Sequence, residues 1–270
     1  MENIISLKSV PVKNAERIIN KYSIKSPTEL DLELIANAEK IIVEYADIGS
    51  ALGKIMYDSD CGIIKLSNNI KEAGQKRFTL AHELGHYFNE YELRTNPVYR
   101  HIDRILSFNT QNKYEDDANE FAAELLMHRI WFNKLCKDRF VSMELLKEIA
   151  GYFNVSLTAA AFRYTEIGKY PTAIIYSTNY KIRWKVFHDY FPFKFIRYNS
   201  NIPAQSAASD FYKGNEMQTC EDLIEAKYWF PEDRNIKEDI YLYEQNLAMP
   251  NYNSVLTLLW EEKSYGKKKY

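Results

Sequence analysis

Apolar side chains in the first part of the chain recur every three or four positions, which is the spacing of amphipathic helices. Residues 12–22 and 27–38 follow this rule, and we expect the second helix to be capped by Ser26 with Pro27 at its first position. Three short runs of β-forming residues follow, and with the turn residues between them they predict an antiparallel meander: 41–46, 54–58 and 62–67.

Helical spacing returns after these strands. It predicts a helix over 71–92, a loop or broken helix over 96–112, and a second strong helix over about 114–135. Residues 143–168 then have the pattern of a helix-turn-helix. Ordinary helical packing is the favoured alternative, because the second of these helices carries only Arg163 as a base-reading cation, where DNA readers usually carry several.

The pattern changes from helical to strand spacing after Pro171, and we place a domain boundary near 165–172. Beyond it, β-branched and aromatic residues dominate the apolar positions, which is typical of strands. Four runs are expected to form strands in this last part of the chain: 172–177, 181–187, 194–198 and 255–260.

Composition narrows the class of protein. Hydrophobic residues make up 46% and charged residues 27%, as in soluble globular proteins, and the net charge of −2 gives no bulk attraction for nucleic acid or anionic membrane. The three cysteines form no CxxC pair, so neither a disulfide framework nor a thiolate zinc site is expected. With neither a signal peptide nor a transmembrane run predicted, we expect a soluble, cytoplasmic protein.

The segment FTLAHELGHYF at 78–88 contains the pattern HExxH. Helical spacing places His82 and His86 one turn apart on one face, where both imidazoles can bind one zinc ion. Glu83 lies one residue round the helix, in position to take a proton from the attacking water. With five histidines in the chain, chance would produce this motif in roughly one of a hundred such sequences. The alternative, that both histidines are simply packed or solvated on a helix and bind no metal, is disfavoured.

A catalytic zinc needs a third protein ligand. On the helix 114–135, Glu115 faces the apolar stripe most closely, and Asn119 follows one turn later, where its amide could hold a ligand in place. A solvated acid at the start of a helix is the alternative for Glu115. The remaining candidates for the third ligand are three histidines and two acids: His101, His128, His188, Asp116 and Asp117.

These residues resemble a known family. FTLAHELGHYF, followed by E-x-x-A-N-x-F-A-A-E-L-L-M at 115–127, is similar to the ImmA/IrrE metallopeptidases, a zincin-like family. The resemblance implies that His82, His86 and Glu115 are zinc ligands and that Glu83 is the general base. One departure is visible, because His128 stands where the family motif ends in proline, and we interpret it as a surface residue or loop contact.

The resemblance also implies an α+β fold with a zincin-like metallopeptidase domain at 1–140, built from a short antiparallel sheet and active-site helices. A helix-turn-helix-like segment at 141–170 and a smaller α+β region at 171–270, which senses a signal or holds the substrate, complete the expected organisation. In zincin-like folds an edge strand pairs with extended substrate, and strand 62–68 precedes the active-site helix, although the sequence does not identify the edge.

The function implied by the resemblance is zinc-dependent endoproteolysis, with one Zn²⁺ per chain. Such peptidases typically cleave a helix-turn-helix repressor or an antitoxin-like partner, often encoded nearby, and so relieve repression of a stress or mobile-element operon. The alternative is a DNA-binding or toxin-neutralising regulator with a structural zinc site. The intact Glu83 and the lack of a basic face weigh against it, so no direct sequence-specific DNA binding and no membrane partner are expected.

Overall fold

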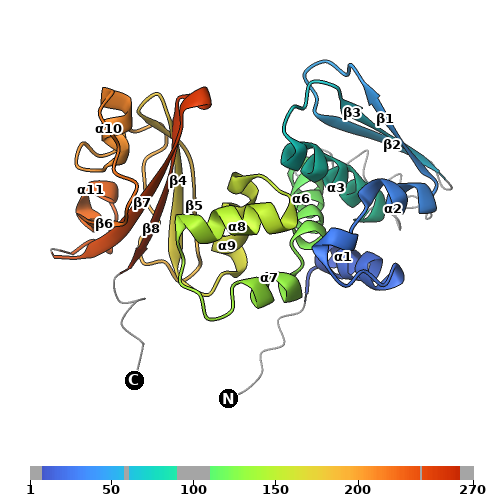
Figure 1. Cartoon of the computed structure of the whole chain (residues 1–270), viewed down its shortest axis with the longest axis horizontal. Coiled ribbons are helices and arrows are strands. Elements are labelled where there is room, and N and C mark those ends of the chain that lie inside the picture. Colours follow the sequence, from blue (N-terminus) through green and yellow to red (C-terminus); the bar gives the residue numbers. More distant parts are fainter. Residues whose placement is uncertain (1–7, 58–60, 90–109, 238, 262–270) are drawn as a thin grey trace. The chain divides into compact units, whose positions relative to one another are not determined.

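The computed structural model describes residues 8–57, 61–89, 110–237 and 239–261. The chain divides into two compact units, and each is described by itself here. The N-terminal unit comprises Met1–Leu135 and Ala150–Ser156, and the C-terminal unit comprises Cys136–Ile149 and Leu157–Tyr270. Both contain helices and strands, so the predicted α+β class is confirmed (Figure 1).

The N-terminal unit is built from helices packed around one small sheet. α1 begins after Ser9, whose hydroxyl accepts a hydrogen bond from the Val12 N–H. The helices of this unit are α1 (Val10–Lys21), the 3₁₀ turn η1 (Pro27–Glu29), α2 (Leu32–Ala38), α3 (Ala73–Asn89), α6 (Thr110–Leu126) and α7 (Arg129–Leu135).

Two of the expected helices are divided in the structure. Residues 27–38 form a short 3₁₀ turn and then α2, because Asp31, and not Ser26, caps the helix by accepting a hydrogen bond from the Leu34 N–H at 3.0 Å. The expected helix 114–135 is broken after Leu126 and resumes as α7. The part of the expected loop that precedes Thr110 lies outside the described residues.

The N-terminal sheet has the strand order β1-β3-β2, where β1 is Ile41–Ala46, β2 is Gly53–Tyr57 and β3 is Gly62–Ser67. The expected meander is therefore wrong, because β3 lies in the centre, antiparallel to β2 but parallel to β1. The strand directions are those of a meander and only the order differs. β3 has the most buried side chains of the three strands, and the central position covers them best.

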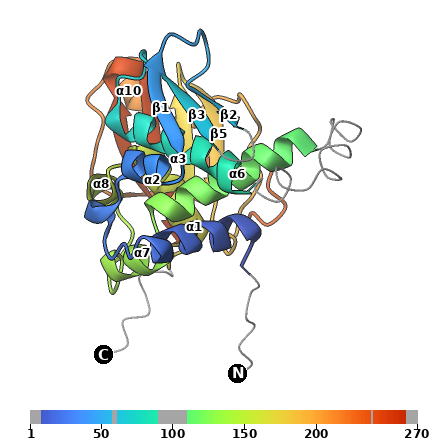
Figure 2. The same ribbon diagram turned by 90° about the vertical axis from the view of Figure 1, so that its right-hand side faces the viewer.

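The central contact of this unit is between α3 and α6, and α1 lies along α6 (Figure 2). A Cβ added to Gly85 on α3 would lie 2.9 Å from the Ala118 carbonyl oxygen and 3.0 Å from the Ala118 Cα on α6. Glycine and alanine thus allow the two backbones to approach closely. This explains why a residue with poor helix propensity stands in the middle of the HExxH motif.

The C-terminal unit is an antiparallel sheet with the order β5-β4-β8-β7-β6. The central strand β8 is buried along almost its whole length, which explains its continuous apolar sequence. From residue 172 on, the elements of the C-terminal unit are β4 (Thr172–Thr178), β5 (Lys181–Phe187), α10 (Ala208–Lys213), β6 (Asp222–Glu225), α11 (Ala226–Trp229), β7 (Tyr241–Met249), η2 (Pro250–Tyr252) and β8 (Ser254–Glu261).

One expected strand is absent from this sheet. Residues 194–198 are irregular, because the Lys194 and Phe195 N–H groups donate to the Asp233 carboxylate at 2.7 and 2.8 Å. These two donors are therefore not available to a neighbouring strand. β6 and β7 were not anticipated from the sequence pattern.

The helix-turn-helix-like segment consists of α8 (Met143–Phe153) and α9 (Leu157–Ile167), and the turn between them has Asn154 at φ 51°. The cation that would read bases, Arg163, is only 1% exposed and pairs with Glu166 at 2.9 Å. This arginine is structural in the fold and is not presented to a phosphate backbone. Across the described part of the chain, no helix combines the length and apolarity needed to cross a bilayer.

Gly85→Ala should destabilise the N-terminal unit, because the new methyl group meets the α6 backbone, which cannot rotate away. Overpacking costs about 1–3 kcal/mol, and the better helix propensity of alanine offsets up to ~1 kcal/mol of that. Chemical denaturation measures the difference. Gly151→Ala on α8 is the matched control, since a Cβ there meets nothing within 4 Å, and it should be neutral or stabilising. Equal stability of the two variants would contradict the close approach.

Candidate metal centre

Two histidines converge on one face of α3. His82 and His86 are separated by one helical turn, and their Nε2 atoms lie 3.1 Å apart. Their side chains are 16% and 14% exposed, so the two nitrogens point into a partly covered space. Burial lowers the pKa of His82, and the neighbouring His86 lowers it further. The His82 imidazole is therefore neutral at pH 7, and its lone pair is available to bind a metal ion.

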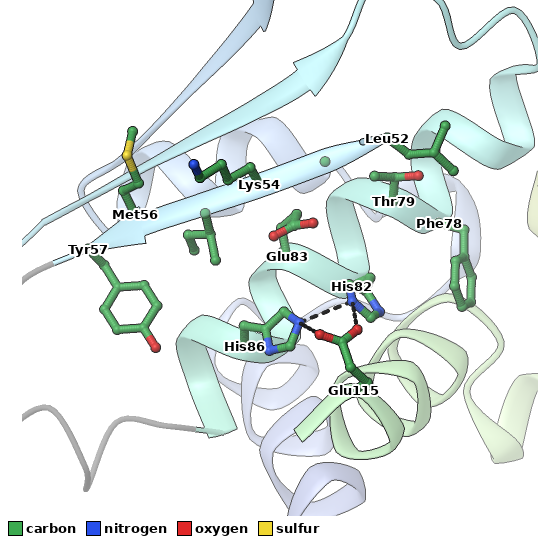
Figure 3. Close-up of a pocket in the computed structure, with 12 residues that line it drawn as sticks. Leu52, Lys54, Met56, Tyr57, Phe78, Thr79, His82, Glu83, His86 and Glu115 are labelled. Atoms are coloured by element: carbon green, nitrogen blue, oxygen red, sulfur yellow. Dashed lines mark hydrogen bonds and ion pairs between the residues drawn. The ribbon is translucent and has the colours of Figure 1, made fainter. Parts of the chain in front are cut away.

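The third donor comes from α6. Glu115 carboxylate oxygens lie 3.2 Å from His82 Nε2 and 3.5 Å from His86 Nε2 (Figure 3). Donors held about 2.0–2.2 Å from one tetrahedral zinc ion are about 3.3–3.6 Å apart, so this spacing suits a single ion. The Glu115 side chain is 56% exposed, which leaves the centre open on its side. Two imidazoles and one carboxylate are a donor set that zinc accepts in catalytic sites.

Asn119 orients one of the ligands. Its Oδ1 lies 2.9 Å from His82 Nδ1, so the Nδ1–H tautomer donates to the amide and Nε2 keeps its lone pair. Asn119 lies one turn after Glu115 on α6, as the sequence spacing suggested. The same helix therefore supplies one carboxylate donor and the group that fixes an imidazole on the facing helix.

Glu83 is separate from the three donors. It is 6% exposed, points to the sheet side of α3, and accepts a hydrogen bond from the Ile55 backbone N–H on β2. Burial raises the pKa of Glu83 to about 7, although the neighbouring His86 and the Ile55 N–H both oppose the shift. A carboxyl group with this pKa can accept and return a proton near neutral pH.

A glycine on β2 makes room for this carboxyl group. A Cβ added to Gly53 would lie 2.5 Å from Glu83 Oε1 and 2.6 Å from Thr79 Cγ2. Any larger residue at Gly53 would therefore displace Glu83 from the Ile55 N–H. Neither Gly53 nor Ile55 was singled out from the sequence, where the only signal was a glycine at the start of a strand.

The donors and Glu83 line a cleft of about 830 Å³ beside β2. Among the described strands, β2 pairs only with β3, so the other edge of β2 borders the cleft. The sequence left the identity of the edge strand open; in the structure β3 is the central strand, and β2 is the edge strand beside the cleft. Most of the remaining lining is apolar or aromatic, with two polar side chains, Lys54 and Thr79; the apolar and aromatic residues are Leu52, Ile55, Met56, Tyr57 and Phe78.

The other candidate ligands do not join these donors. His128 was expected to be a surface residue or a loop contact; it lies in the link between α6 and α7, is buried at 6% exposure, and lies near Glu16 and Glu124. His188 belongs to the C-terminal unit, where its ring contacts the Gly168 carbonyl and the Tyr190 N–H. Asp116 and Asp117 lie on the same helix as Glu115 but do not join the donor cluster. His101 lies outside the described residues.

Comparisons with known proteins point to a family of peptidases. Residues 36–165 match the family model described as the IrrE N-terminal-like domain of the M78 peptidases. Metallopeptidase ImmA of Bacillus subtilis is 29% identical over 142 residues, which cover 52% of this chain and 78% of that protein. Uncharacterized immunity region protein 2 of Bacillus phage phi105 is 30% identical over 112 residues, 42% of this chain and 65% of the phage protein.

A solved structure of a Mycobacterium tuberculosis transcriptional regulator is also similar, with a TM-score of 0.61 over 95% of this chain and 77% of that one. At 14% identity this likeness shows the fold alone. The HExxH helix and the family match support a metallopeptidase domain, and such a domain implies a bound metal. The family model and the curated relative thus support an ImmA/IrrE family metallopeptidase, as the motifs suggested.

Glu115→Ala should remove one equivalent of bound zinc, because two imidazoles alone hold the ion weakly. Asp117→Ala, the matched loss of a carboxylate on α6, should keep it. Asn119→Ala should weaken zinc affinity by roughly 10–100-fold, the usual effect of losing a group that orients a ligand. Metal analysis after dialysis against graded chelator measures all three. Full zinc retention in Glu115→Ala would exclude it as a ligand.

Proposed function

We propose that the chain is a zinc-dependent endopeptidase in which His82, His86 and Glu115 hold the ion and Glu83 is the general base. The observation that carries this proposal is the division of the site into two parts. Three candidate metal donors lie at 3.1–3.5 Å from one another, and a buried carboxyl group, Glu83, lies one residue round α3 from His82, towards β2. A site that only held metal for structure would have no use for that carboxyl group.

The proposed chemistry assigns one task to each group. A zinc ion held by the three donors would acidify water and polarise the scissile carbonyl. Glu83, half ionised at its pKa of about 7 and increasingly ionised above it, takes the proton of the attacking water as a carboxylate and returns it to the leaving amine. The Ile55 N–H holds the Glu83 carboxylate against β2, which keeps the base from turning into solvent.

The open edge of β2 suits an extended peptide. Alternate residues of an antiparallel strand point their backbone groups to the same side, and the Ile55 N–H points away from β3 towards Glu83. Gly53 and Tyr57, two residues to either side, therefore present backbone groups to the cleft. Main-chain pairing there would fix the substrate beside the metal, and the apolar lining would select its side chains.

We infer the substrate class from the family. A helix-turn-helix repressor or an antitoxin-like partner, encoded near this gene, fits the resemblance, and one relative is named for a phage immunity region. Cleavage would relieve repression of a stress or mobile-element operon. A DNA-binding regulator is the weaker alternative, because the one cation of the presumed recognition helix, Arg163, is buried and bonded to Glu166.

Glu83→Gln should keep zinc and the fold while losing proteolysis by at least ~10², because the amide cannot accept a proton. The assay is cleavage of the helix-turn-helix protein encoded beside the gene, with zinc content measured on the same preparation. Cleavage by the Gln variant at the wild-type rate would contradict the role of Glu83. A wild-type protein that cleaves no such partner would contradict the proposed substrate class.

Gly53→Ala should lower kcat by roughly 10²-fold, the cost of misplacing a reacting group by about 1 Å, with zinc content unchanged. The matched control is Gly62→Ala on β3, where a Cβ would meet no atom closer than 3.5 Å. This control should cleave like the wild type. Steady-state kinetics and melting temperature separate a displaced base from a damaged sheet. Equal kcat in both variants would show that Glu83 needs no space at Gly53.

A further inference from the structure

A second group of metal-binding side chains lies at the other end of α6. Glu16 on α1, Glu124 near the end of α6 and His128 in the link to α7 each offer one donor atom, and these atoms all lie within 4.8 Å of one another. Glu124 is fully buried and His128 is 6% exposed. All three belong to the N-terminal unit, where α1 runs alongside α6 (Figure 2).

The distances between these atoms suit an ion placed between them. His128 Nε2 lies 3.8 Å from Glu124 Oε1 and 3.9 Å from Glu16 Oε1, both too long for a direct hydrogen bond. With the third separation at 4.8 Å or less, a point equidistant from the three atoms lies at most about 2.5 Å from each, close to the ~2.0–2.2 Å of zinc–nitrogen and zinc–oxygen bonds. Small side-chain movements would complete the fit.

Charge favours a divalent cation at this point. Two carboxylates converge there, and Glu124 is fully buried, so a divalent cation between the two carboxylates would offset part of the cost of burying them. Lys8 supplies some positive charge from outside, at 2.5 Å from Glu16, but its side chain is 53% exposed and can move aside. An imidazole with two carboxylates suits zinc-class ions better than Mg²⁺ or Ca²⁺, which prefer oxygen donors alone.

Two of the three donors are held in place by neighbours. The Arg129 N–H, at the start of α7, donates to Glu124 Oε1 at 3.1 Å, and the Trp131 ring packs against the His128 ring with centroids 5.1 Å apart. Glu16 lies on α1, which packs along α6. A donor set with restricted side chains loses little conformational entropy when it binds an ion.

We propose that Glu16, Glu124 and His128 form a second site for a zinc-class divalent ion, which fastens α1 to the end of α6. The site is distinct from the peptidase centre, since Glu115 and Glu124 are separated by nine residues, or about 13 Å along the helix. It depends on His128, and the proline that ends the family motif would provide no nitrogen donor. The ion would stabilise the helix that also carries Glu115, whether or not the proposed proteolysis takes place.

The test uses the full chain with the first site removed, as the double variant His82→Ala, Glu115→Ala. Titration with Zn²⁺, and with Co²⁺ as a spectroscopic probe, should show one remaining equivalent bound at micromolar or tighter affinity, with a rise in melting temperature. Adding Glu16→Gln or His128→Ala should weaken that binding at least 10-fold. Glu120→Gln is the matched control on the same helix and should leave it unchanged.

Several outcomes would overturn the site. One is the absence of a second equivalent up to ~100 µM metal, and another is binding that persists unchanged in both Glu16→Gln and His128→Ala. Equal binding of Mg²⁺ would also contradict a zinc-class site. If His128 instead bridges the carboxylates as an imidazolium, no metal will bind and His128→Ala will cost more stability at pH 6 than at pH 8. Because Glu16 is partly exposed, its Gln variant keeps the test decisive if His128→Ala fails to fold.

Discussion

The close approach of α3 and α6 is the contact on which the peptidase centre depends. At Gly85 and Ala118 the two helices touch through backbone atoms, and no side chain separates them. This contact brings Glu115 within 3.5 Å of both imidazoles and lets Asn119 reach His82 Nδ1. A methyl group at Gly85 would push α6 outward, and a shift of a fraction of an ångström would change the spacing of the three candidate donors, His82, His86 and Glu115. The small residues in the two motifs thus serve the geometry of the ligands.

The sheet contributes the other half of the site. β2 lies at the edge of the sheet, its Ile55 N–H holds the Glu83 carboxyl group, and Gly53 leaves the space that this group occupies. Burial against the strand raises the pKa of Glu83 towards neutrality, so the packing that positions the carboxyl group also tunes its proton affinity. The same strand edge borders the cleft, which would align an extended peptide with the base and the metal donors. The position and the raised pKa of the Glu83 carboxyl group therefore both depend on one short strand.

The links between helices determine which side chains are buried. The break between α6 and α7 turns His128 inward, where it faces Glu124 and Glu16, although its place at the end of a motif suggested a surface residue or loop contact. In the C-terminal unit, Asp233 takes two backbone N–H groups that a strand at 194–198 would have used. Arg163 looked like a base-reading cation and is instead buried in an ion pair. In each case polar contacts, some local and some between distant residues, accompany a local structure that the sequence pattern did not predict.

The sequence by itself determined what depends on neighbours along the chain: helical spacing puts His82 and His86 on one face, Glu83 beside them, and Glu115 one turn before Asn119. It also indicated the α+β class and, through its motifs, the resemblance to a family of metallopeptidases. Only the tertiary structure decided the strand order. In a meander and in the observed sheet alike, β3 is antiparallel to β2 and parallel to β1, so strand direction does not distinguish the two orders. The burial of β3 favours the order in which it is the central strand. The tertiary structure also decided that Gly53 and Ile55 contact Glu83 and that His128 is buried, because these contacts join residues far apart in sequence, whose approach depends on how whole elements pack.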